Sequence, residues 1–276
     1  MAGTVPFPIG VFDSGVGGLT VLRALQSELP GEDFIYLGDT ARLPYGTKSA
    51  ATVIRYSVQA AELLVARGIK ALVVACNTAS AAALPDLQRR FAALPVIGVV
   101  EPGARAAVAA SRSGNIVVLA TEGTVRGGAY QRAIAAARPE ARVTAVACQL
   151  FVALAEEGWI DGGVVAGTVA RYLDPVWHQL GTVLAPDTLV LGCTHFPVLR
   201  GAIARHVGEG VRLVDSAATT AAAAHALLAA RALLRGAATG GRTHYLATDG
   251  SARFAGVGRH FLGRELAPEA VEIVDL

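Results

Sequence analysis

Two cysteines stand at matching places in this chain, each directly after an apolar segment and directly before a polar turn that contains threonine. Cys76 follows residues 71–75, and Cys193 follows residues 188–192. An ionised thiol can take a proton from carbon, and a protonated thiol can return one. Two thiols that face one carbon from opposite sides could therefore remove and replace its hydrogen. The repeated pattern predicts an enzyme that inverts a carbon stereocentre with paired acid/base cysteines.

The polar residues after each thiol indicate that a helix begins there. Asn77 and Thr78 can cap an alanine-rich stretch, and Pro197 fits the first helical position after Thr194 and His195. A helix N-terminus lowers the pKa of a nearby thiol. Its backbone N–H groups can also bind a substrate carboxylate. We therefore expect both helix starts to contribute to one binding site.

The other ionisable residues differ in how well their sequence context suits chemistry. Cys148 also ends an apolar run but lacks the polar turn, so we expect it to be structural. Asp13 ends the apolar residues 9–13, where a carboxylate can pair with an ammonium group or assist a thiol. His195 is the only one of six histidines placed two residues from a candidate thiol. The remaining histidines are expected in the core or on the surface: His178, His206, His225, His244 and His260.

The composition favours a soluble protein that acts on a small molecule. The chain has 276 residues, of which 53% are hydrophobic and 17% charged, and its formal net charge is +2. This balance provides neither a basic surface for nucleic acid nor an acidic tail. The longest uncharged run, residues 71–85, contains polar residues, and residues 1–8 lack the features of a signal peptide. We expect a cytoplasmic protein with no nucleic-acid or membrane partner and with free thiols.

Short apolar runs alternate with stretches rich in alanine, leucine and arginine, which is typical of parallel sheets covered by helices. The first eight predicted strands divide into two sets of four, because a cysteine followed by a threonine-containing turn ends the third strand of each set. We therefore predict an α/β fold of two similar three-layer parallel-sheet domains related by pseudo-twofold symmetry. The predicted strands span residues 9–13, 34–39, 71–76, 96–100, 115–121, 142–148, 188–193, 211–215, 243–248 and 271–274.

We assign residues 1–98 together with 211–276 to the first α/β domain, and residues 99–210 to the second. Ligands of open parallel sheets bind at the carboxyl ends of the strands. Both candidate thiols stand at such ends. The active site is therefore expected in the cleft between the two domains.

The sequence offers little support for a bound cofactor. Lys48 and Lys70 are the only lysines, and neither lies in a motif that would hold pyridoxal phosphate. Lys70 opens a predicted strand, where we expect an exposed strand end. The glycines after Asp13 resemble a dinucleotide loop, but Thr20 stands where the third glycine would be. We expect neither a cofactor nor a metal.

Three other classes of function remain open from the residues alone. A cysteine hydrolase could use Cys193 with His195, although this leaves the repeated Cys76 without a role. A two-domain protein could bind an amino acid in its cleft without catalysis. A metal site made of these two thiols and the histidine would lack a compact ligand motif.

Four segments of the chain resemble the motifs of glutamate racemases. They are FDSGVGGLT at residues 12–20, GDTARLPYG at 38–46, ACNTAS at 75–80 and LGCTH at 191–195. The segments occur in the family's order, and the resemblance covers nearly the whole chain. It implies a homodimeric, cofactor-independent enzyme whose two cysteines convert L-glutamate to D-glutamate for bacterial peptidoglycan. A related racemase of aspartate or a hydantoin would use the same two thiols.

The resemblance also implies roles for individual residues. Cys76 and Cys193 would be the acid/base pair, assisted by Asp13 and His195. Glu156 would be a further helper, with its neighbour Glu157 as the alternative. The residues that would hold the substrate are Asp13, Ser14, Pro44, Tyr45, Gly46, Asn77, Thr78, Thr121, Thr194 and His195.

Overall fold

The apolar runs of the chain form two separate parallel sheets in the computed structural model, which describes residues 7–235 and 240–276. Every predicted strand is present, and the strand ends differ from the prediction by at most two residues. The first sheet contains β1 (Ile9–Asp13), β2 (Phe34–Gly38), β3 (Ala71–Val74), β4 (Val96–Gly98), β9 (Thr243–Ala247) and β10 (Val271–Ile273). The second contains β5 (Asn115–Ala120), β6 (Arg142–Ala147), β7 (Thr188–Gly192) and β8 (Arg212–Asp215).

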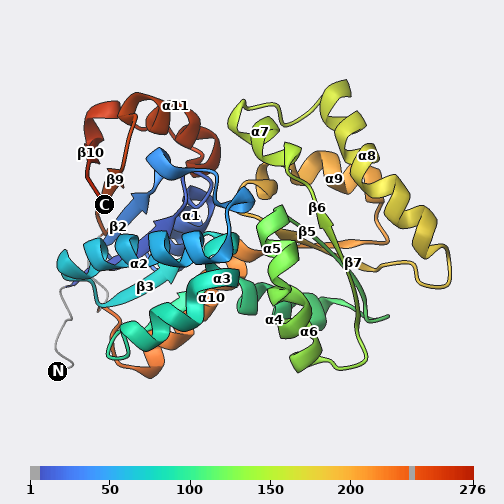
Figure 1. Cartoon of the computed structure of the whole chain (residues 1–276), viewed down its shortest axis with the longest axis horizontal. Helices are drawn as coiled ribbons and strands as arrows, with labels where there is room; N and C mark the ends of the chain where they lie inside the picture. Colours follow the sequence, from blue (N-terminus) through green and yellow to red (C-terminus); the bar gives the residue numbers. More distant parts are fainter. Residues whose placement is uncertain (1–6, 236–239) are drawn as a thin grey trace.

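The two sheets repeat the same order of strands. The first sheet has the order β10-β9-β2-β1-β3-β4, and the second has the order β6-β5-β7-β8. Without β10 and β9, which extend the first sheet beyond β2, both sheets therefore run second, first, third, fourth. The internal repeat expected from the sequence is thus present in the topology, with the six-stranded sheet at the left of Figure 1 and the four-stranded sheet at the right.

Helices cover both faces of each sheet, as the two apolar faces of a buried parallel sheet require. Helices α1, α10 and α11 pack on one face of the first sheet, and α2 and α3 pack on the other. Helices α7, α8 and α9 cover one face of the second sheet, and α4 and α6 cover the other. Their bounds are α1 Leu19–Glu28, α2 Ala50–Ala66, α3 Asn77–Arg90, α4 Val100–Ala110, α5 Glu122–Gly127, α6 Ala129–Ala137, α7 Leu150–Glu156, α8 Gly163–Leu180, α9 Arg200–Val207, α10 Ser216–Ala230 and α11 Ser251–Leu262.

The chain returns from the second sheet to the first through α10. Asp215 ends β8 and caps α10, because its Oδ1 accepts hydrogen bonds from the backbone N–H groups of Ala217 and Ala218. The expected boundary at residues 210 and 211 assigned β8 to the first domain. Since β8 pairs with β7, this strand lies in the second sheet instead. Apart from β8, we propose the expected division, with residues 1–98 and 211–276 in the first domain and residues 99–210 in the second. Residues 1–6 and 236–239 lie outside the described part of the chain.

No helix among the described residues is long and apolar enough to span a membrane. The expectation that residues 1–8 lack the features of a signal peptide stays a prediction, because residues 1–6 lie outside the described part of the chain.

The first sheet encloses a buried ion pair at the end opposite the candidate thiols. The Nζ atom of Lys70, just before β3, pairs with Oε2 of Glu32, just before β2. Only 1% and 2% of these side chains are exposed. The other oxygen of Glu32 accepts a hydrogen bond of 2.6 Å from the backbone N–H of Arg235. The expectation of an exposed Lys70 is therefore wrong, because a carboxylate compensates for the burial of its charge.

Replacing Lys70 by Met is expected to lower the free energy of unfolding by about 3–5 kcal/mol, because the Glu32 carboxylate would remain buried without its cation. The double replacement Lys70→Met with Glu32→Gln is expected to lower it much less, since neither charge remains. Urea unfolding followed by circular dichroism measures both values. A double variant no more stable than Lys70→Met would contradict this explanation.

Candidate active site

The two candidate thiols stand at equivalent places in the two sheets. Cys76 follows β3 and Cys193 follows β7, and each of these strands lies beside the first strand of its sheet. Each residue is only 5% exposed. Cys76 is the N-cap of α3, where its Sγ accepts a hydrogen bond of 3.4 Å from the backbone N–H of Ala79. A short 3-10 helix, Phe196–Leu199, follows Cys193.

Cys76 lies in surroundings that favour the neutral thiol. Its Sγ donates a hydrogen bond of 3.5 Å to Oγ of Ser14. Burial, followed by the charge of Asp13, raises the pKa of Cys76 to about 12, although the contacts with Ser14 and Ala79 oppose the shift. The lowered pKa expected from the helix N-terminus is therefore wrong for this thiol, because desolvation outweighs the helix dipole. Cys76 carries its proton at neutral pH.

Cys193 has a different set of partners. Its Sγ lies 3.8 Å from Nδ1 of His195, and Nε2 of the same ring lies 3.2 Å from Oε1 of Glu156. Burial disfavours a charged ring, but the hydrogen bonds to Cys193 and Glu156 outweigh it and raise the pKa of His195 to about 10. The contact with His195 lowers the pKa of Glu156 in spite of its partial burial. The carboxylate of Glu156 therefore holds a protonated imidazole beside Cys193.

Asp13 occupies the carboxyl end of β1, where its charge acts on Cys76 and on His195. It is completely buried, and this burial raises its pKa, while the charge of His195 acts in the opposite direction. Its Oδ2 accepts a hydrogen bond of 2.9 Å from the backbone N–H of Gly15. Its Oδ1 is also buried and has no hydrogen-bond partner among the described residues. This oxygen is a free acceptor at the site, of the kind that a ligand ammonium group can use.

The turn after β1 contacts the turn after β7 directly. A Cβ atom at Gly17 would lie 2.4 Å from Nδ1 of His195 and 2.6 Å from Oγ1 of Thr194, so only glycine permits this approach. The hydroxyl of Thr20 donates a hydrogen bond of 3.0 Å to the backbone carbonyl of Thr194. The sequence motif containing Gly17 therefore shapes the contact between the two halves of the site rather than a phosphate loop.

A second group of polar contacts joins α3 to the elements after β5. The hydroxyls of Thr78 and Thr121 lie 2.8 Å apart, and that of Thr124 lies 3.1 Å from Thr121. The amide nitrogen of Asn77 donates a hydrogen bond of 2.9 Å to the hydroxyl of Tyr130. The amide oxygen of Asn77 is buried and has no partner among the described residues. Sequence reasoning missed Thr124 and Tyr130, although Thr124 follows Thr121 by one helical turn.

The segment with Pro44, Tyr45 and Gly46 lies after β2 and completes this side of the site. The hydroxyl of Tyr45 donates a hydrogen bond to Oδ2 of the fully buried Asp39, a residue that sequence reasoning also missed. A Cβ atom at Gly46 would lie 2.8 Å from Cβ of Thr121, so the segment packs closely against α5. Pro44 is exposed. All residues expected from the resemblance except the exposed Pro44 and Glu157 therefore lie among these buried or partly buried contacts.

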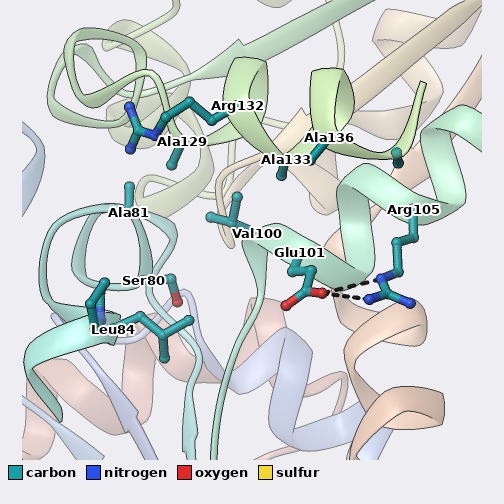
Figure 2. Close-up of a pocket in the computed structure, with 12 residues that line it drawn as sticks. Ser80, Ala81, Leu84, Val100, Glu101, Arg105, Ala129, Arg132, Ala133 and Ala136 are labelled. Carbon is teal, nitrogen blue, oxygen red and sulfur yellow. Dashed lines mark hydrogen bonds and ion pairs between the residues drawn. The ribbon is translucent and has the colours of Figure 1, made fainter. Parts of the chain in front are cut away.

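Two cavities lie among these elements, and neither of them is lined by Cys76 or Cys193. A cavity of about 130 Å³ adjoins Glu156, and Val16, Thr40, Leu43 and Arg253 also line it. A second cavity, of about 610 Å³, lies between α3, α4 and α6, where Glu101 and Arg105 form an ion pair (Figure 2). The described residues contain no cluster of three or more histidine, cysteine or acidic side chains placed to hold a metal ion.

Comparisons with known proteins find relatives of one family. Residues 9–224 match the family model of Asp/Glu/hydantoin racemases. The chain is 53% identical over 258 residues to a glutamate racemase of Geobacter metallireducens, which covers 94% of this chain and 93% of the relative. It is also similar to the structure of the Thermus thermophilus glutamate racemase, with 43% identity, a TM-score of 0.87 and 99% of both chains covered. The Francisella tularensis glutamate racemase in complex with D-glutamate has 37% identity, a TM-score of 0.88 and 98% of both chains covered.

The ring of His195 is expected to lose its proton near pH 10. In a Glu156→Gln variant the ring should titrate closer to the unperturbed value of about 6.5, because it loses an anionic partner. Glu157→Gln is the matched control and should leave this titration unchanged. NMR of nitrogen-labelled histidine side chains measures both midpoints.

The same shift affects stability. The pKa of His195 is higher in the folded than in the unfolded chain, so its proton stabilises the fold fully below about pH 6.5. This contribution is lost as the pH rises through about 10. An unfolding free energy that declines equally over this window in the Glu156→Gln variant would contradict the role of the carboxylate.

Proposed function

Because the chain belongs to the family of Asp/Glu/hydantoin racemases and is an amino-acid racemase, we propose that it interconverts L-glutamate and D-glutamate with Cys76 and Cys193 as acid and base. The observation that carries this proposal is a pair of buried thiols at equivalent strand ends whose neighbouring ionisable groups differ. Cys76 is protonated, whereas Cys193 faces the protonated ring of His195.

A two-base inversion needs one thiolate and one thiol in each direction of turnover. The His195 imidazolium, 3.8 Å from Cys193, supplies the cation that a thiolate at this position requires. The Cys193 thiolate would take the α-proton from one face of the substrate, and the Cys76 thiol would deliver its proton to the other face. After turnover Cys193 would be the thiol and Cys76 the thiolate. Turnover of the opposite enantiomer would restore the first arrangement. No cofactor takes part in this scheme.

The unpaired polar atoms of the site suit an amino acid. Oδ1 of Asp13 and Oδ1 of Asn77 are free acceptors for an α-ammonium group. The hydroxyls of Thr78 and Thr121 and the backbone N–H groups at the start of α3 are donors for carboxylates. These donors explain how two carboxylates could bind without an arginine among the residues assigned to hold the substrate. Ser14, Tyr45, Gly46 and Thr194 would complete the enclosure of the substrate.

Removal of an α-proton from an amino acid needs an environment from which water is excluded, because fixed dipoles must stabilise the developing charge. The contacts that join the two halves, Thr20 with Thr194 and Thr78 with Thr121, close the site in this structure. We propose that these contacts separate to admit glutamate and form again around it.

We further propose the biological setting that the resemblance implies. D-glutamate from this reaction would supply bacterial peptidoglycan synthesis in the cytoplasm. The enzyme would act as a homodimer, which light scattering of the purified protein tests directly. Growth of a strain that requires D-glutamate, restored by this chain, would support the metabolic role.

Single replacements of the thiols test the proposed mechanism. Cys76→Ser and Cys193→Ser are each expected to reduce racemisation of both enantiomers by about 10²–10⁴-fold, because each removes one of two proton-transfer groups. Cys148→Ala is the matched control, since this buried cysteine lies after β6 and has no part in the scheme. Circular dichroism measures inversion, and deuterium incorporation in heavy water measures α-proton exchange with cofactor-free protein.

The outcomes separate the proposal from its competitors. Racemisation that survives the loss of either thiol would overturn the two-base mechanism. Turnover of aspartate or a hydantoin in place of glutamate would keep the mechanism and change the substrate. Glutamate binding without exchange of its α-proton would identify a binding protein.

A further inference from the structure

Arg253 links the Cys193 half of the site to the opposite domain. This residue lies in the first turn of α11, which packs against the first sheet, whereas Glu156 ends α7 on the second sheet. Nη2 of Arg253 lies 3.2 Å from Oε2 of Glu156. The other carboxylate oxygen, Oε1, lies 3.2 Å from Nε2 of His195. Each oxygen of Glu156 therefore has one cationic partner. Arg253 belongs to the first domain and His195 to the second.

The start of α11 is held in place by the same segment that carries Tyr45. The hydroxyl of Thr248 donates a hydrogen bond of 2.9 Å to Oδ1 of Asp39, whose Oδ2 accepts from Tyr45. The hydroxyl of Thr40 donates a hydrogen bond of 2.6 Å to the backbone carbonyl of Asp249. These bonds fix the chain just before α11. The position of Arg253 is thereby coupled to the segment expected to hold the substrate.

A second residue of α11 contacts the same histidine. The ring of Phe261 meets the ring of His195 edge to face, with 5.1 Å between the ring centroids. Phe261 is completely buried, so this contact fixes the plane of the imidazole. One helix of the first domain therefore acts on His195 twice, once by packing and once through the carboxylate of Glu156.

We propose that Arg253 is a positioning residue, which holds Glu156 against His195 from across the cleft and so orients the imidazole toward Cys193 when the domains close. This inference rests on the proposed function for its kinetic consequence. Arg253 itself touches neither thiol. It acts through Glu156, whose side chain is 16% exposed and would otherwise be free to turn toward solvent.

The groups around His195 decide whether loss of Arg253 raises or lowers the pKa of this ring. The ionisable groups that act on the ring are Cys193, Glu156 and Asp13. From the first domain, the turn with Gly17 approaches the ring closely, and α11 contacts it through the apolar Phe261. Glu156 is the group among these that Arg253 contacts. Loss of the arginine would release this carboxylate from its fixed place. The imidazolium would then lose a fixed acceptor at Nε2, and its proton would be held less tightly.

The exposure of Arg253 limits how much its loss can change the His195 pKa and kcat. The Arg253 side chain is 67% exposed, and ion pairs of such residues have small coupling energies. Such energies correspond to a lowering of the His195 pKa by about half a unit and to a fall in kcat of about two- to fivefold. An effect of this size on KM alone is not expected, because the proposed role concerns the proton transfer and not the capture of substrate.

The experiment compares wild type with Arg253→Met, Arg253→Lys and the control Arg259→Met. Arg259 lies on the same helix, is also exposed and pairs with Glu265 at 3.7 Å rather than with Glu156. NMR of labelled histidine gives the pKa of His195, and kcat and KM for glutamate are measured against pH in both directions. Arg253→Met should lower the His195 pKa and kcat, Arg253→Lys should restore most of both, and Arg259→Met should change neither.

Three results would overturn the proposal, and one would instead concern the function on which it rests. An unchanged or raised His195 pKa in Arg253→Met would show that the arginine does not hold the carboxylate in place. A salt-dependent rise in KM with unchanged kcat would identify Arg253 as a group that attracts the anionic substrate. Equal losses in Arg259→Met would indicate a general effect on α11. Wild-type protein that does not racemise glutamate would refute the proposed function, while the NMR comparison would still test the positioning.

Discussion

Ionisable groups at this site are buried at the contact between two domains, and this burial is the constraint on which its chemistry depends. Removing water raises the free energy of every charged group, so each charge must have a partner or be neutralised. Cys76 and Asp13 respond with raised pKa values, whereas His195 keeps its charge because its hydrogen bonds to Cys193 and Glu156 compensate for burial. The proton states of the site therefore follow from which groups the fold supplies with partners.

The contact between the domains also depends on small and hydroxyl-bearing residues. Gly17 and Gly46 permit the approach of His195 and Thr121, because a Cβ atom at either glycine would overlap these neighbours. Threonine hydroxyls then form hydrogen bonds across the contact, as between Thr78 and Thr121. A hydroxyl can both donate and accept, so it can exchange a partner on the protein for one on a ligand at low cost. These hydroxyl contacts can open and close without leaving a charge unpaired.

Much of this arrangement could be predicted from the sequence, because the relevant signals are local. Apolar runs that end in Cys76 and Cys193 predicted both the strands and the thiols at their ends, and the repeat predicted two similar parallel-sheet domains. The helix start at Cys76 was also predictable, but the pKa of its thiol was not, because desolvation depends on residues distant in the chain. Tyr130 and Arg253 were missed for the same reason, since their partners come from other elements. The division into two sets of four strands assigned β8 to the correct sheet, and only the domain boundary at residues 210 and 211 placed it with the first domain.

The repeat gives the two thiols equivalent positions, but it does not give them equivalent partners. Cys76 lies beside Ser14 and Asp13, which are close to it on the first sheet, and Cys193 lies beside an imidazole held by Glu156. Two thiols with identical surroundings would favour the same proton state, and neither state alone can both remove and deliver a proton. The proposed reaction therefore explains why Cys76 and Cys193 have different partners, since it needs one thiol and one thiolate at the same time. Because the enantiomers of glutamate have equal free energies, the reversed proton arrangement must also be accessible after each turnover. Asp13 suits this requirement, since a buried carboxyl that can take up a proton need not oppose a thiolate at Cys76.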